Sequence, residues 1–185
     1  MRRIFIFGTL LLMTGVAPAA PTDKDNLYEV EVVVFENKHA QSGDELGPGG
    51  KNSTPIPGLD NAIVPPAPTT GSHKLAGSTA QLKKYGQYRV LSHQRWIQPM
   101  DAKGGVKARR IGAGGELDGL VKVYMNRYLH ADVHLVFKDE QWGGARYYRI
   151  DEQRRVKSQE VHYYDHPRFG VLLRVSALEK EPDEL

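Results

Sequence analysis

Two short stretches of this 185-residue chain combine imidazoles with carboxylates at spacings that could bind a metal ion or transfer protons. Each contains two histidines and an aspartate: His130, Asp132 and His134 in the first, and His162, Asp165 and His166 in the second. The first set alternates along the chain, so its side chains would share one face of a strand. Such groups can ligate zinc, or can act as general acid and base in a hydrolase.

The rest of the sequence argues against both activities. Polar residues alternate in this way on the solvent face of many strands, and no HExxH spacing is present. The chain has no cysteine, no GxSxG or SxxK motif, and no glycine-rich loop that opens a helix to hold phosphate. We therefore expect no catalytic residue, no metal ligand and no cofactor.

Tyrosines and arginines surround the same two stretches. Aromatic rings pack on half-exposed sheets, but they also stack on sugars while neighbouring arginines pair with carboxylates. We take as candidate ligand-binding residues Arg127, Tyr128, His130, Arg154, Arg155, His162, Tyr163 and Tyr164. A separate set forms a predicted structural corner, because short carboxylates, proline and glycine are typical of chain reversals. This set is Asp165, His166, Pro167 and Gly170.

Strands must position these residues. The alternating pattern predicts strands over 27–36, with one buried face, and over 87–98. Residues 117–138 keep apolar side chains on odd positions for about twenty residues, so one strand of this length would be bent, bulged or shared between two parts of the sheet. Arg127 would lie at that bend or point inward. Three further strands are predicted over 146–156, 160–164 and 171–175. A short reversal at 157–159 would make 160–164 the pairing partner of 146–156.

One helix and one long loop complete the predicted fold. Residues 73–84 predict a helix that Gly86 ends. Prolines and glycines accumulate over about 42–72 with few large apolar side chains, which predicts a mobile insertion. The expected fold class is α+β, a single domain with a mostly antiparallel β-sheet of about six strands in hairpin order, one main helix and the long Pro/Gly-rich loop.

The first residues indicate export. Arg2 and Arg3 precede an apolar run that ends in small residues, so 1–19 reads as a cleavable signal peptide and 20–185 as a single exported domain. The apolar run is too short to span a bilayer, so the protein is not expected to be membrane-embedded. The formal charge is +3 with those two arginines and +1 without them, which argues against nucleic acid as a partner.

Five blocks of the sequence, in one order, resemble the CsiV family of periplasmic peptidoglycan-binding proteins. The blocks are Y28-E-V-E-V-V-V-F35, Y88-R-V-L-S-H-Q-R-W96, Y124-M-N-R-Y-L-H130, R154-R-V-K-S-Q-E160 and H162-Y-Y-D-H-P-R-F-G-V-L172. The resemblance covers most of the exported chain and leaves the Pro/Gly-rich insertion unmatched. It transfers no binding residue, because the family has none that could be matched to this sequence.

The resemblance implies a non-catalytic protein that binds peptidoglycan. It also implies that the protein activates cell-wall synthesis through a class A penicillin-binding protein and that enzyme's outer-membrane lipoprotein activator. Two alternatives stay open. One is a cell-wall hydrolase that uses a metal or the histidine and aspartate groups, and the other is a periplasmic scaffold that touches only proteins.

Overall fold

Over the residues that the structure describes, the protein is a two-layered β structure with one α-helix. The computed structural model describes residues 26–40, 55–66, 71–112, 114–140 and 144–178. The strands are β1 Leu27–Asn37, β2 Tyr88–Pro99, β3 Arg109–Arg110, β4 Leu117–Met125, β5 Leu129–Asp139, β6 Arg146–Arg155, β7 Val161–His166 and β8 Phe169–Ala177. The helices are η3 Leu59–Asn61 and α1 Ala76–Lys84. The predicted signal peptide lies outside the described residues.

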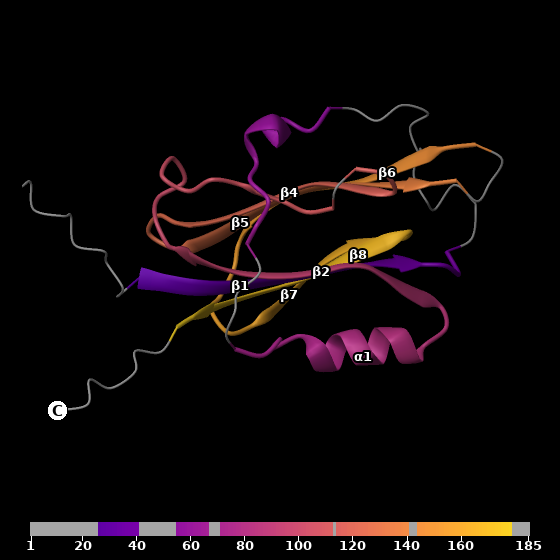
Figure 1. Ribbon diagram of the computed structural model, residues 1–185, viewed down its shortest axis with the longest axis horizontal. Coiled ribbons are helices and arrows are strands. Elements are labelled where there is room, and N and C mark those ends of the chain that lie inside the picture. Colours follow the sequence, from indigo (N-terminus) through magenta and orange to yellow (C-terminus); the bar gives the residue numbers. More distant parts are fainter. Residues whose placement is uncertain (1–25, 41–54, 67–70, 113, 141–143, 179–185) are drawn as a thin grey trace, which may run out of the picture.

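The strands form two antiparallel sheets of four, where about six strands in a single sheet were predicted. Sheet A has the order β2-β1-β8-β7, and sheet B has the order β3-β4-β5-β6. Figure 1 shows the two sheets as two layers, with α1 on the far side of sheet A from sheet B. Apolar side chains from both sheets meet in one core, which includes Val32, Trp96 and Leu173 from sheet A and Val133 and Leu135 from sheet B.

Strand β1 is buried on both faces from Glu29 to Glu36, whereas the sequence predicted one buried face. Val30, Val32 and Val34 point into the core between the sheets. The opposite side chains, which include Glu29 and Glu31, face away from that core and are also buried. A buried carboxylate must be paired or hydrogen-bonded. Sequence alternation alone therefore could not reveal that this second face is covered.

Residues 117–138 form a hairpin of β4 and β5, and not the one long strand considered from the sequence. Met125 pairs with Leu129, so the connection has three residues, and the exposed Arg127 lies at its centre. In this register an odd-numbered residue of β4 always pairs with an odd-numbered residue of β5. The apolar side chains that face the core therefore have odd numbers in both strands. The alternation of apolar and polar residues therefore continues through the turn, and for this reason the sequence pattern did not reveal the hairpin.

The predicted pairing of 146–156 with 160–164 is wrong. β6 pairs with β5 in sheet B, while β7 pairs with β8 in sheet A. The short connection between β6 and β7 therefore passes from one layer to the other. Within it, Gln159 has a left-handed φ of 66°, a conformation that non-glycine residues adopt mainly in turns.

Two further segments pack on the outer faces of the sheets. α1 contacts β2 of sheet A and begins at Ala76, three residues later than predicted. Residues 55–66 belong to the predicted 42–72 insertion, and within them Ile56 is buried against Leu120 and Val136 on the outer face of sheet B. Residues 42–54 and 67–70 of that insertion lie outside the described part of the chain.

Candidate functional site

The outer face of sheet B brings polar side chains of β4, β5 and β6 into rows. Tyr124 lies opposite His130, and His130 lies opposite Arg155. In the next row Lys122 lies opposite Asp132. Side chains opposite one another on one face of antiparallel strands are close enough to interact directly. The register therefore places basic and aromatic groups next to one another on this face.

Four of the eight predicted ligand-binding residues meet at the hairpin end of this face. The guanidinium carbon of Arg155 lies 3.6 Å from the ring centre of Tyr128, and that of Arg127 lies 5.5 Å from the same ring. Tyr128 is 41% exposed. His130 stacks on the buried Tyr124 with ring centres 5.3 Å apart, and its Nδ1 lies 2.7 Å from the carbonyl oxygen of Tyr128. We name Arg127, Tyr128, His130 and Arg155 the basic aromatic patch.

A cleft of about 570 Å³ adjoins this patch on the same face. Its polar lining includes Lys103, Lys107, Lys122, Asp132 and His134, and residues 57–61 form part of its wall. Lys103 Nζ lies 2.8 Å from the Asp132 carboxylate and 5.2 Å from the ring centre of Tyr124, so this side chain connects the cleft to the patch. The hydrogen bond with Asp132 raises the pKa of Lys103.

The charge of this cleft is positive. Asp132 is paired with Lys103, and His134 is hydrogen-bonded to Asp151 at 2.5 Å. Within the described residues, neither Lys107 nor Lys122 has an ion-pair partner. A second cleft, of about 480 Å³, lies elsewhere and is lined by four carboxylates. Those carboxylates belong to Glu36, Glu116, Asp139 and Glu140. Of the two, the lysine-lined cleft is the one suited to an anionic ligand.

The other four predicted ligand-binding residues lie away from the patch. Arg154 donates to the carbonyl oxygen of Tyr163 and lies 3.7 Å from the ring centre of Tyr164, so it connects sheet B to sheet A. The ring of Tyr164 is fully buried in the core, and this burial raises its pKa. Tyr163, 47% exposed, stacks on Phe35. His162 Nε2 contacts the backbone of Lys157.

The predicted structural corner lies at the turn between β7 and β8. His166 Nδ1 accepts a hydrogen bond from the Arg168 backbone N–H, and the carbonyl oxygen of Pro167 accepts one from Asn37. The Asp165 carboxylate accepts a hydrogen bond of 2.6 Å from the Tyr163 hydroxyl. A β-carbon at Gly170 would lie 2.7 Å from Phe35 Cζ, which is closer than carbon atoms pack.

Sequence reasoning missed the most buried charge of the corner, Arg168. Its side chain is completely buried, and one guanidinium nitrogen lies 3.2 Å from Glu36 Oε1 and 2.5 Å from Asp139 Oδ2. Glu36 belongs to sheet A and Asp139 to sheet B, so the ion pairs join the layers. Arg89 binds the other oxygen of Glu36 and makes a bidentate pair with Glu116. No sequence pattern marks these five residues as partners.

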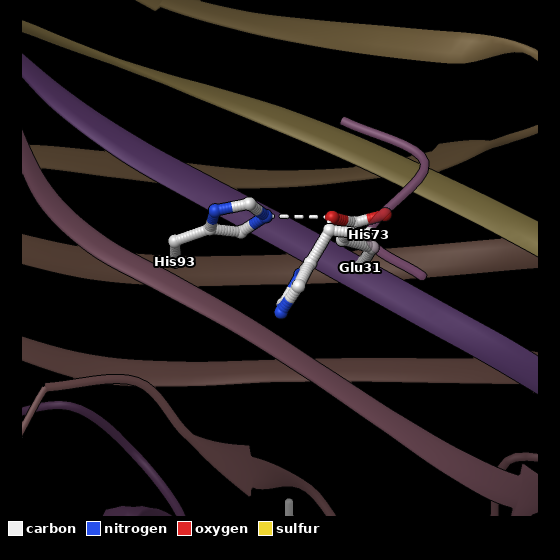
Figure 2. Close-up of side chains that lie close together, drawn as sticks. All are labelled: Glu31, His73 and His93. Atoms are coloured by element: carbon white, nitrogen blue, oxygen red, sulfur yellow. Dashed lines mark hydrogen bonds and ion pairs between the residues drawn. The ribbon is translucent and has the colours of Figure 1, made fainter. Parts of the chain in front are cut away.

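A second missed group is Glu31, His73 and His93, which come from three separate segments. Their side chains point toward one another on the outer side of sheet A (Figure 2). In the part of the chain that the structure describes, this is the one group of three or more histidines and carboxylates with metal-binding proximity. His130, Asp132 and His134 instead contact Tyr124, Lys103 and Asp151, respectively. Only the histidine and glutamate residue types could have suggested the group.

Among the described segments, no helix has the length and apolar character needed to cross a membrane. A family model described as "Peptidoglycan-binding protein, CsiV" matches residues 64–178. The matched region runs from the segment before α1 to the residue after β8 and contains four of the five blocks noted in the sequence. No curated protein and no solved structure matches the chain.

Proposed function

The chain belongs to the CsiV family of peptidoglycan-binding proteins, and from this premise we propose that it is exported to the periplasm and binds the cell wall through the outer face of sheet B. The binding surface consists of the basic aromatic patch and the lysine-lined cleft. A signal peptide over 1–19 accounts for export. The single observation that carries this assignment is the concentration of cationic groups around Tyr128 and His130 on one face.

The chemistry of peptidoglycan matches this surface. Its stem peptides carry carboxylates, and its glycan strands present sugar faces that stack on aromatic rings. The free ammonium groups of Lys107 and Lys122 would pair with carboxylates in the cleft. The guanidinium groups of Arg127 and Arg155 would each bind a carboxylate through two hydrogen bonds. Tyr128 is half-exposed, and the Arg155 guanidinium covers one face of its ring, so a sugar would stack on the part of the ring that Arg155 leaves open.

Binding without catalysis fits the contacts of Asp165 and His166. On β7, Asp165 is exposed and accepts from Tyr163, whereas His166 contacts the Arg168 backbone N–H. A hydrolase needs a base within hydrogen-bond reach of the proton it removes and a second group that orients it. The separate contacts of Asp165 and His166 do not form that arrangement. Release of muropeptides from sacculi by the purified protein would favour the hydrolase instead.

We further propose that wall binding serves regulation of a class A penicillin-binding protein, through its outer-membrane lipoprotein activator. The sequence resemblance supports this role. A photocrosslinker placed at Tyr128 would report which molecules contact the patch. A second photocrosslinker at Tyr163 would report which molecules contact edge strand β7, where Val161 and Tyr163 are each 47% exposed. Crosslinks to protein alone, at either site, would favour the protein-only scaffold.

A pull-down with purified sacculi tests wall binding. The double variant Lys107→Glu/Arg155→Glu reverses one exposed charge of the cleft and one of the patch. Each exposed pair contributes about 0.2–1 kcal/mol, and reversal adds repulsion, so we expect a loss of affinity of about tenfold or more at low salt. The matched control Lys83→Glu/Lys84→Glu makes the same charge change on α1 and should bind like the wild type. Equal binding by all three proteins would contradict the proposed surface.

A further inference from the structure

Glu31, His73 and His93 converge on the outer side of sheet A, in the layer farthest from the proposed wall-binding face. Glu31 lies on β1, His93 on the neighbouring β2, and His73 in the segment that leads into α1. Glu31 Oε1 is 2.6 Å from His93 Nε2 and 3.0 Å from His73 Nδ1. The three potential ligand atoms all lie within 4.8 Å of one another (Figure 2). One carboxylate oxygen thus faces two imidazole nitrogens.

This donor set has the composition of a transition-metal site. Two imidazoles and one carboxylate are ligands for Zn²⁺, and the nitrogen donors disfavour Ca²⁺ or Mg²⁺, which prefer oxygen. In a tetrahedral zinc site with bonds of about 2.0–2.2 Å, neighbouring ligand atoms are about 3.4 Å apart. The observed separations of 2.6 and 3.0 Å would widen by less than about 1 Å. Side-chain rotation of the half-exposed His73 can supply part of that change.

The carboxylate is held in position by the backbone. Glu31 is 1% exposed, and its second oxygen, Oε2, accepts a hydrogen bond of 3.0 Å from the Leu75 N–H at the start of α1. This bond leaves Oε1 directed at the two histidines. His73 has a side-chain exposure of 46%, so the group is open to solvent on one side. An ion could enter there, and a water molecule could complete its coordination.

The hydroxyl of Thr79 selects the tautomer that a metal needs. Thr79 Oγ1 lies 2.9 Å from the Leu75 carbonyl oxygen and 3.4 Å from His93 Nδ1. The single hydroxyl proton goes to the carbonyl, so toward His93 the oxygen can only accept, and Nδ1 must carry a proton. Nε2 lies 2.6 Å from the Glu31 carboxylate and donates a hydrogen bond to it, so a metal ion would displace this Nε2 proton while Nδ1 keeps its own. A hydrogen-bonded second ring nitrogen is the usual environment of a metal-ligating histidine.

We propose that Glu31, His73 and His93 bind a Zn²⁺-like transition-metal ion, with Thr79 positioning His93. The bound ion fixes the segment from His73 to Thr79 against β1 and β2. It satisfies both the lone pair of His93 and the charge of the buried Glu31. Binding at this site is independent of wall binding, because the two surfaces lie on opposite layers of the fold.

Titration of the untagged protein with Zn²⁺ by calorimetry tests the site, since a histidine tag would bind the ion itself. We expect one ion per chain, and a melting temperature that rises by about 5–10 °C when free Zn²⁺ is a hundredfold above the dissociation constant. Co²⁺ should give the visible absorption of a low-symmetry site with nitrogen ligands. Glu31 and His93 are partly structural, so the first variant is His73→Gln at the half-exposed ligand.

His73→Gln should weaken Zn²⁺ binding at least tenfold and abolish the Co²⁺ absorption. The control His39→Gln changes an exposed histidine outside the group and should bind both ions like the wild type. His93→Gln, if folded, should show the same loss as His73→Gln. Absence of saturable Zn²⁺ binding, or binding that His73→Gln leaves unchanged, overturns the proposal. Neither result bears on sacculus binding, which is measured separately.

Discussion

Replacing Arg168 with alanine is expected to lower the free energy of unfolding by about 4 kcal/mol. The Arg168, Glu36 and Asp139 side chains are at most 1% exposed, and the guanidinium also donates to the Asn37 carbonyl oxygen at 3.1 Å. Removing one partner of a buried ion pair costs about 3–5 kcal/mol, because the remaining charge stays desolvated. For a chain of this size, the loss corresponds to a melting temperature lower by about 8–16 °C.

Urea denaturation followed by tryptophan fluorescence measures this loss, because Trp96 is completely buried in the core and reports its exposure. Arg168→Met keeps much of the side-chain volume and removes the charge, so it should remain strongly destabilised if the carboxylates cause the effect. The comparison variant is Arg89→Ala, which removes a 44% exposed partner of the same Glu36 and should cost about 1 kcal/mol. Equal losses for Arg168→Ala and Arg89→Ala, or recovery in Arg168→Met, would refute the buried-charge reasoning.

Three other predictions follow from named contacts. Burial, with a contribution from the charge of Arg168, lowers the pKa of His166 below its usual 6.5. As the pH falls, the unfolded chain therefore binds a proton at this residue at a higher pH than the folded chain does. Stability should therefore fall as pH decreases through 6.5, and His166→Asn should flatten this part of a curve of urea midpoint against pH. Gly119→Ala should cost about 3 kcal/mol by urea denaturation, because φ is +153° and the new β-carbon would lie 2.2 Å from the His134 carbonyl oxygen. Gly170→Ala should cost less, about 1–2 kcal/mol, because it meets rings, one of them the half-exposed Tyr163, that can shift.

Local sequence patterns predicted the strands well and their partners poorly. The strands over 27–36 and 87–98 are confirmed within a residue or two at each end. The pairing of 146–156 with 160–164 is wrong, because alternation shows which residues share a face and says nothing of which strand lies alongside. The division into two sheets depends on contacts across the layers, such as Arg168 with Asp139, which local pattern does not encode.

The residues of the candidate surface also could not be grouped from local sequence pattern alone. Arg127, Tyr128, His130 and Arg155 come together because a three-residue turn and the register of β5 with β6 place them at one end of a sheet. The group of Glu31, His73 and His93 depends on how the segment before α1 lies across sheet A. Glu31 itself reads from the sequence as an ordinary solvent-facing strand residue. Its burial is visible only when the covering segment is placed.

The three-residue connection between β4 and β5 restricts the insertions and deletions that the protein tolerates in this loop. If the turn kept its three residues, inserting or deleting one residue there would shift β5 by one position and would turn Val133 and Leu135 outward and Asp132 and His134 into the core. A change of two residues would keep every side chain on its present face. Substitutions and two-residue grafts around Arg127 are therefore the changes that keep the facing of β5 without a new turn type, both for natural divergence and for an engineer who reshapes the patch.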